Sequence, residues 1–109
     1  MTITYKILGQ TRPTAETQSN IYTVPAGSSA VVSTVNICNQ QASSDNFRIA
    51  VVPSGETLSA EHYISYNVIV PAYDSIALTI GITLSAGDQI SAYSNSGNIS
   101  FNIFGSEVN

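Results

Sequence analysis

The chain has 109 residues, a formal net charge of −4 and a charged fraction of only 9%, so we expect a single domain covering residues 1–109. Three cations, Lys6, Arg12 and Arg48, are too few to cover a phosphate backbone, which argues against nucleic-acid binding. A lone cysteine excludes a disulfide framework and a thiolate metal site. No stretch approaches the ~20 apolar residues of a membrane span and no signal peptide is recognisable, so we expect synthesis in the cytoplasm and no membrane contact.

Alternation of apolar and polar residues, the pattern of β-strands, dominates the first half of the chain. The first alternation places Ile3, Tyr5 and Ile7 on one face. A polar stretch at about 9–20 follows, and its composition predicts a loop or an extended arm that is long for a domain of this size. Strands are expected in this half at 2–8, 21–24, 29–39 and 46–52.

The second half continues the same alternation, and only the segment 56–63 is compatible with a helical turn. Its clearest signal is the stretch 74–84, where five apolar residues alternate with small or polar ones around Gly81. A glycine in mid-strand suggests a bulge or a close backbone approach, and an ordinary strand glycine is equally compatible. Strands are expected in this half at 63–70, 74–84, 89–94 and 98–104. About eight strands separated by polar turns predict an all-β fold, an antiparallel β-sandwich of jelly-roll or immunoglobulin-like order.

Two similar phrases, VPAG at 24–27 and VPAYDS at 70–75, each precede a long strand. Proline has no N–H and a fixed φ, so it is found at the edges and starts of strands. The phrase SAGD at 85–88 repeats the turn without the proline. A turn that leads into a strand explains all three phrases, whereas a duplicated ligand-binding loop explains only the first two.

The sequence contains no recognisable catalytic, cofactor or metal motif, so we expect a non-enzymatic protein without a cofactor. His62 is the only histidine, and sixteen serines make any serine–histidine pairing uninformative. Asp74 and Asp88 stand alone at turns, where aspartate usually accepts hydrogen bonds from the local backbone. Glu56 and Glu61 flank the one irregular segment and are the remaining candidates for the paired carboxylates of a glycoside hydrolase, but nothing in their spacing selects them.

Tyrosines gather in the second half of the chain at Tyr63, Tyr66, Tyr73 and Tyr93. A tyrosine on the rim of a sandwich can stack on a sugar or contact a protein, because its ring is apolar and its hydroxyl polar. Half-buried packing with the hydroxyl at the surface is the competing interpretation of each. Asp74 lies beside Tyr73, so we treat these five residues as candidate contacts with a partner or a glycan.

Six phrases spread along the chain resemble small β-sandwich structural proteins of tailed bacteriophages, especially phages of cyanobacteria. The phrases are YTVPAG, VVSTVNICNQ, FRIAVVPSGE, EHYISYN, IALTIGITLSAGDQISAYS and ISFNIFGSEV, and they span about Ile21 to Val108. The resemblance implies a virion component, either a head decoration or cement protein or a β-rich module of a tail or fibre. It supplies no catalytic residue.

The resemblance and the composition lead to two expectations for function. The first is a capsid cement or decoration protein, a homo-oligomer that stabilises the head shell of the virion by binding the major capsid protein or other virion proteins. The polar arm at 9–20, or an edge strand at 2–8, would make the contact by strand addition. The alternative is a tail, baseplate or fibre-associated module that binds a host-surface glycan through the tyrosines.

Overall fold

The computed structural model describes all 109 residues as a β-sandwich of nine strands with one 3₁₀ turn. The strands are β1 (Ile3–Thr11), β2 (Ser19–Thr23), β3 (Ser29–Asn39), β4 (Asp45–Val52), β5 (Tyr63–Val70), β6 (Ser75–Leu78), β7 (Ile82–Leu84), β8 (Gln89–Ser94) and β9 (Ile99–Val108). The 3₁₀ turn η1 (Ala60–His62) falls in the segment predicted to be able to form a helical turn. The structure has no helix that is long and apolar enough to span a membrane.

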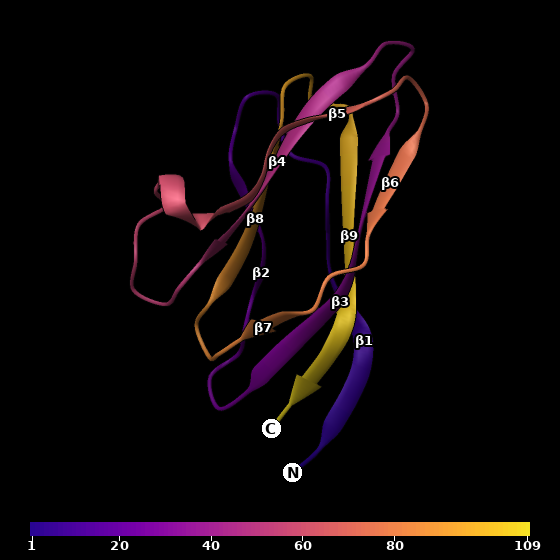
Figure 1. Ribbon diagram of the computed structural model, residues 1–109. Coiled ribbons are helices and arrows are strands. Elements are labelled where there is room, and N and C mark those ends of the chain that lie inside the picture. Colours follow the sequence, from indigo (N-terminus) through magenta and orange to yellow (C-terminus); the bar gives the residue numbers. More distant parts are fainter.

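The strands form two antiparallel sheets that pack face to face (Figure 1). One sheet has the order β1-β9-β3-β6, with β7 also paired to β3, and the other has the order β2-β8-β4-β5. The chain crosses between the sheets at every connection except β4 to β5 and β6 to β7. With β6 and β7 taken as one interrupted strand, this is the eight-stranded arrangement of a jelly roll. It is not the immunoglobulin order, in which the first strand pairs with the second.

The predicted strand at 74–84 is two strands, because the chain leaves the ladder at 79–81. β6 pairs with the second half of β3, and β7 pairs with its first residues. The register of β3 against β9 shifts between Val32 and Thr34, the point that separates these two partners. A side chain at Gly81 would meet nothing within 4 Å, so the close backbone approach considered for this glycine is absent.

The core lies between the sheets and is apolar. Along β9, the fully buried Ile99, Phe101 and Ile103 alternate with residues that are more exposed, as the period of a strand requires. Phe101 meets Phe47 of the opposite sheet edge-on, with ring centroids 6.1 Å apart and an interplanar angle of 69°. Each such side chain contributes roughly 1.5–3 kcal/mol through burial, which makes this layer the main source of stability.

The three similar phrases of the sequence form the same turn, and each leads directly into a strand. In 25–28, 71–74 and 85–88, the N–H of the fourth residue donates to the carbonyl of the first at 3.2, 3.2 and 3.0 Å. A further copy occurs at 53–56, at 3.1 Å. The third residue of each turn has a positive φ: Gly27 (+79°), Tyr73 (+53°), Gly87 (+85°) and Gly55 (+80°). The interpretation as strand-entry turns is therefore confirmed for the three predicted copies.

The polar loop is shorter than the predicted range of 9–20, because β1 continues to Thr11 and β2 begins at Ser19. The remaining residues, 12–18, do not extend away as an arm. Arg12 Nη2 donates to Asn98 Oδ1 at 2.6 Å, and the Glu16 N–H donates to the Ser94 carbonyl at 2.9 Å. These bonds hold the loop against the turn between β8 and β9 of its own domain.

Candidate functional site

A β-bulge places two residues of β5 opposite one residue of β4. In this ladder Phe47 pairs with Val68 and Ile49 pairs with Ser65. One residue of β4, Arg48, therefore faces two residues of β5, Tyr66 and Asn67. Bulges are over-represented at sheet edges and next to active sites, and they re-aim side chains.

Arg48 is held between two aromatic rings and an amide. Its Cζ lies 4.2 Å from the ring centroid of Tyr66 and 4.3 Å from that of Tyr93, its direct partner on β8. Its Nε donates a hydrogen bond of 2.7 Å to Asn67 Oδ1. Tyr63 packs edge-on against Tyr66, with centroids 5.0 Å apart and an interplanar angle of 86°. We call these five residues the Arg48 cluster.

The Arg48 cluster contains no acidic group. The one ion pair formed by a lysine or arginine joins Lys6 to Glu107, and Glu56 contacts His62, so Arg48 has no carboxylate partner. Nε is the only Arg48 nitrogen that donates a hydrogen bond within the chain, and the terminal nitrogens Nη1 and Nη2 donate none. A guanidinium between two rings is stabilised by cation–π attraction, which fixes its plane while its terminal nitrogens stay unused.

Of the five predicted contact residues, the structure brings Tyr63, Tyr66 and Tyr93 together and leaves Tyr73 and Asp74 apart. Tyr73 is 73% exposed in the turn 71–74, and its N–H donates to the Gln41 carbonyl at 3.1 Å. Asp74 Oδ1 accepts the N–H of Ser75 at 2.8 Å, the local backbone bond expected of a turn aspartate.

Sequence reasoning missed Arg48 and Asn67, the two polar members of the cluster. The signal available was a cation inside an apolar alternation. Its partners could not be named, because they depend on the register of β4 against β5. A strict alternation through β5 would place Ile64, Tyr66, Val68 and Val70 on one face, but only Val70 of these is buried. The bulge interrupts the period of two, and β5 is an edge strand.

A second candidate surface lies on the outer face of the five-stranded sheet. It is a shallow hollow of about 520 Å³ lined by Tyr5, Lys6, Ile7, Val31, Ser33, Phe104, Gly105 and Ser106. Its residues come from β1, β9 and the start of β3, three strands that lie side by side in the sheet (Figure 1). The face predicted for Ile3, Tyr5 and Ile7 is real, but it is exposed, with Tyr5 83% accessible.

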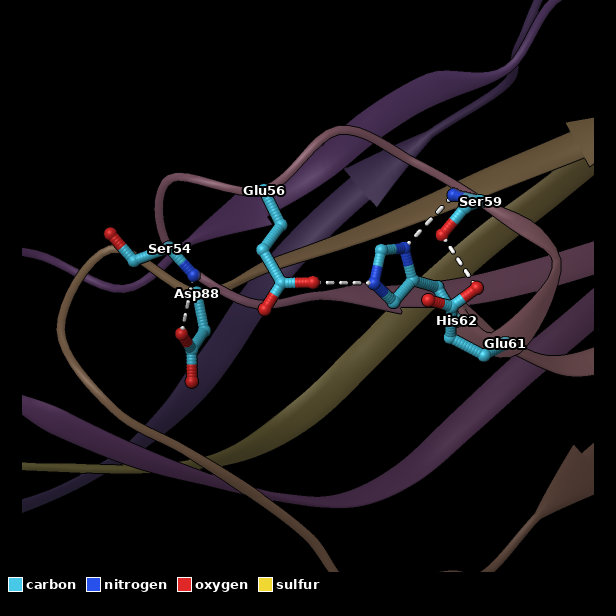
Figure 2. Close-up of polar contacts among 6 residues, drawn as sticks. All are labelled: Ser54, Glu56, Ser59, Glu61, His62 and Asp88. Atoms are coloured by element: carbon cyan, nitrogen blue, oxygen red, sulfur yellow. Dashed lines mark hydrogen bonds and ion pairs between the residues drawn. The ribbon is translucent and has the colours of Figure 1, made fainter.

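The segment 53–62 brings the predicted acid and histidine candidates close together (Figure 2). His62 Nδ1 accepts the N–H of Ser59 at 3.0 Å, so a neutral ring carries its proton on Nε2, which lies 3.1 Å from Glu56 Oε1. Ser59 Oγ donates to Glu61 Oε1 at 2.7 Å, and this bond lowers the pKa of Glu61. Both ring nitrogens of the buried His62 are thus used in contacts within the segment 56–62, which ends in η1.

The same close-up shows how this segment is joined to its neighbour. Asp88 Oδ1 accepts the N–H of Ser54 at 2.9 Å. The other oxygen, Asp88 Oδ2, accepts the N–H of Ser85 at 2.8 Å. None of Glu56, Glu61 and His62 lines the hollow on the outer face of the five-stranded sheet. No group of three or more histidine, cysteine, aspartate or glutamate side chains is placed to hold a metal ion.

A comparison of the chain with known protein families and with curated proteins gave no match. Function is therefore inferred from the two surfaces described above.

Proposed function

We propose that the chain is a non-enzymatic structural protein of a tailed-phage virion, a capsid cement or decoration protein that stabilises the head shell. The observation that carries the proposal is the open edge strand β1, which has no partner on one side and exposes apolar side chains. A long exposed edge strand is a template for pairing with another chain. The resemblance to phage β-sandwich proteins supplies the class of partner.

The chemistry of β1 suits a permanent contact. Ile3, Tyr5 and Ile7 are exposed on one face of the strand, and Tyr5 and Ile7 line the hollow beside β9. The only charged residue of β1, Lys6, already pairs with Glu107 at 2.9 Å. A partner strand would therefore meet an apolar and locally neutral surface. Its backbone would form hydrogen bonds with β1, and its apolar side chains would pack on those of β1. The partner is the major capsid protein, another virion protein or a second copy of this chain.

The test is to measure how many copies of this chain each virion contains. In purified particles, quantitative mass spectrometry against the major capsid protein should find this chain in a simple ratio to the capsid subunits. A few copies per particle would instead assign it to the tail. When purified particles take up added protein, Tyr5→Glu should lower the fraction of binding sites that the protein occupies. Thr57→Glu, the same charge change at an exposed position of the loop 53–58, should leave that fraction unchanged.

A second candidate function is favoured by the Arg48 cluster. In this alternative the chain is a tail, baseplate or fibre-associated module that binds a host-surface glycan. The exposed Tyr66 and the half-buried Tyr63 and Tyr93 lie beside a fixed cation, and aromatic rings with a charged group are what sugar recognition uses. A glycan array with Tyr63, Tyr66 and Tyr93 each changed to Ala would test it, and the absence of binding by the unmodified chain would reject it.

A further inference from the structure

We propose that the Arg48 cluster is a carboxylate-binding site, and that its ligand is an acidic sugar such as a uronic or sialic acid. This site rests on the second candidate function, glycan binding. It deepens that function by naming the group that Arg48 recognises.

The guanidinium of Arg48 is positioned before any ligand arrives. Tyr66 and Tyr93 lie over Cζ at 4.2 and 4.3 Å, and Asn67 accepts from Nε at 2.7 Å. An arginine held this way loses little conformational freedom on binding, which is the main cost of using a long side chain. Lysine could not take the same place, because its ammonium is not planar.

Most of the binding capacity of Arg48 is unused. A guanidinium has five N–H donors, and the structure uses only the one on Nε. No acidic residue pairs with Arg48, although the chain carries seven acids for its three lysines and arginines. Two parallel hydrogen bonds from the terminal nitrogens match the geometry of a carboxylate.

The backbone that positions Asn67 has an uncommon conformation. This residue has φ +53°, the left-handed region that non-glycine residues seldom occupy. Asparagine tolerates this conformation better than most residues, and here it also delivers Oδ1 to Nε of Arg48. Backbone strain at a bulge that orients one cation is typical of a binding site.

The surroundings favour a sugar over an inorganic or nucleotide phosphate. Tyr66 is 57% exposed, so part of its ring is available to the C–H groups of a pyranose. The other strong cations, Lys6 and Arg12, lie on β1 and the loop that follows it, in or beside the other sheet. A single bidentate donor suits the one charge of a carboxylate better than the higher charge of phosphate, which usually recruits several cations.

The test is an NMR titration of the full chain with glucuronate and N-acetylneuraminate, compared with glucose and with the methyl ester of glucuronate. The acids should bind at least tenfold more tightly than the ester and should shift the Arg48 Nε–H resonance. Arg48→Gln should weaken acid binding at least tenfold, and Arg48→Lys nearly as much. Arg12→Gln, the matched loss of a cation elsewhere, should leave binding unchanged.

Asn67→Gly separates binding from folding, because glycine accepts the positive φ without strain but cannot hold Nε. This variant should keep its melting temperature and lose several-fold in affinity for glucuronate. Equal binding of acid and ester would overturn the carboxylate site and leave a glycan-binding module. Binding of no sugar would overturn both, and binding of an acidic peptide through Arg48 without any sugar would overturn the choice of ligand.

Discussion

The Tyr22 hydroxyl donates a hydrogen bond of 2.5 Å to Glu107 Oε2, and this bond joins the two sheets of the sandwich. Tyr22 belongs to β2 and is buried, whereas Glu107 lies near the end of β9. The other oxygen of the carboxylate accepts from Lys6 Nζ of β1 at 2.9 Å. Three strands are thus tied at the end of the molecule where the chain termini meet (Figure 1), with Thr2 and Asn109 exchanging backbone bonds of 2.7 and 3.0 Å.

The first prediction concerns the pH dependence of this link. The hydrogen bond from Tyr22, and next the contact with Lys6, lower the pKa of Glu107, while burial and the Glu107 contact raise the pKa of Tyr22. A lowered carboxyl pKa stabilises the fold above the unfolded value of about 4.3 and is lost as the pH falls through the folded value. Glu107→Gln should therefore cost about 1–2 kcal/mol at pH 7 and progressively less below pH ~4.

Urea unfolding of both proteins between pH 2.5 and 8 measures this difference. Tyr22→Phe serves as the partner variant, because it removes the donor and should narrow the same pH-dependent gap. A constant difference between the natural chain and Glu107→Gln over the whole range would contradict the assignment.

The second prediction concerns Gly105, which lies where β9 passes the register shift of β3. A Cβ at this position would approach the Val31 carbonyl oxygen to 2.0 Å and the Cα of Val32 to 3.0 Å. Both contacts are with backbone, which cannot move aside without breaking the ladder. Gly105→Ala should therefore destabilise the fold by at least about 2 kcal/mol in chemical unfolding.

Gly81→Ala is the matched control, because a Cβ there would meet nothing within 4 Å and its φ is not in the left-handed region. This change should be neutral or stabilising by up to about 1 kcal/mol. Equal unfolding midpoints for the two alanine variants would show that β9 can shift away from β3.

Much of the fold could be predicted from the sequence, because period-two alternation and turn residues act locally. The turns at 25–28, 71–74 and 85–88 are where the phrases placed them. Strand order was not accessible, since pairing β9 between β1 and β3 depends on contacts that are distant in sequence. The break at 79–81 could not be predicted either, because the apolar alternation of the sequence continues through it.

The candidate site could be predicted only in part. The tyrosines of the second half drew attention to Tyr63, Tyr66 and Tyr93. Tyr63 packs on Tyr66, and Tyr66 and Tyr93 both flank Arg48. The residue that joins two of them, Arg48, depends on a bulge, and a bulge changes the register without any fixed residue signature. Tyr73 was grouped with them by its type alone, and the turn that holds it lies elsewhere.

The third prediction concerns Tyr73, which has a positive φ at a turn position where the other three copies carry glycine. A non-glycine residue in this conformation costs roughly 1–2 kcal/mol. Because the side chain is mostly exposed, little packing offsets that cost. Tyr73→Gly should therefore raise stability by about 0.5–1 kcal/mol, measured as an increase in the urea midpoint.

The reverse exchange is the control for this turn. Gly27 has φ +79°, and a Cβ added to it would meet only open space, so Gly27→Tyr should lower stability by a similar amount. A loss of stability in Tyr73→Gly would mean that the tyrosine ring packs against the loop it borders.

The fourth prediction is that the chain self-associates through β1. Two β1 strands from different copies can pair antiparallel about a two-fold axis, which joins two five-stranded sheets and places the same apolar residues of each copy side by side. Tyr5 is near the middle of the exposed face, and the nearest cation, Lys6, is already paired with Glu107. A carboxylate introduced by Tyr5→Glu would therefore find no free cation, and the two copies would bring two such charges together.

Sedimentation equilibrium should show a dimer of the natural chain whose dissociation constant rises at least tenfold in Tyr5→Glu and stays unchanged in Thr57→Glu. A natural chain that stays monomeric up to millimolar concentration would contradict pairing through β1 and would leave this edge to a different virion protein.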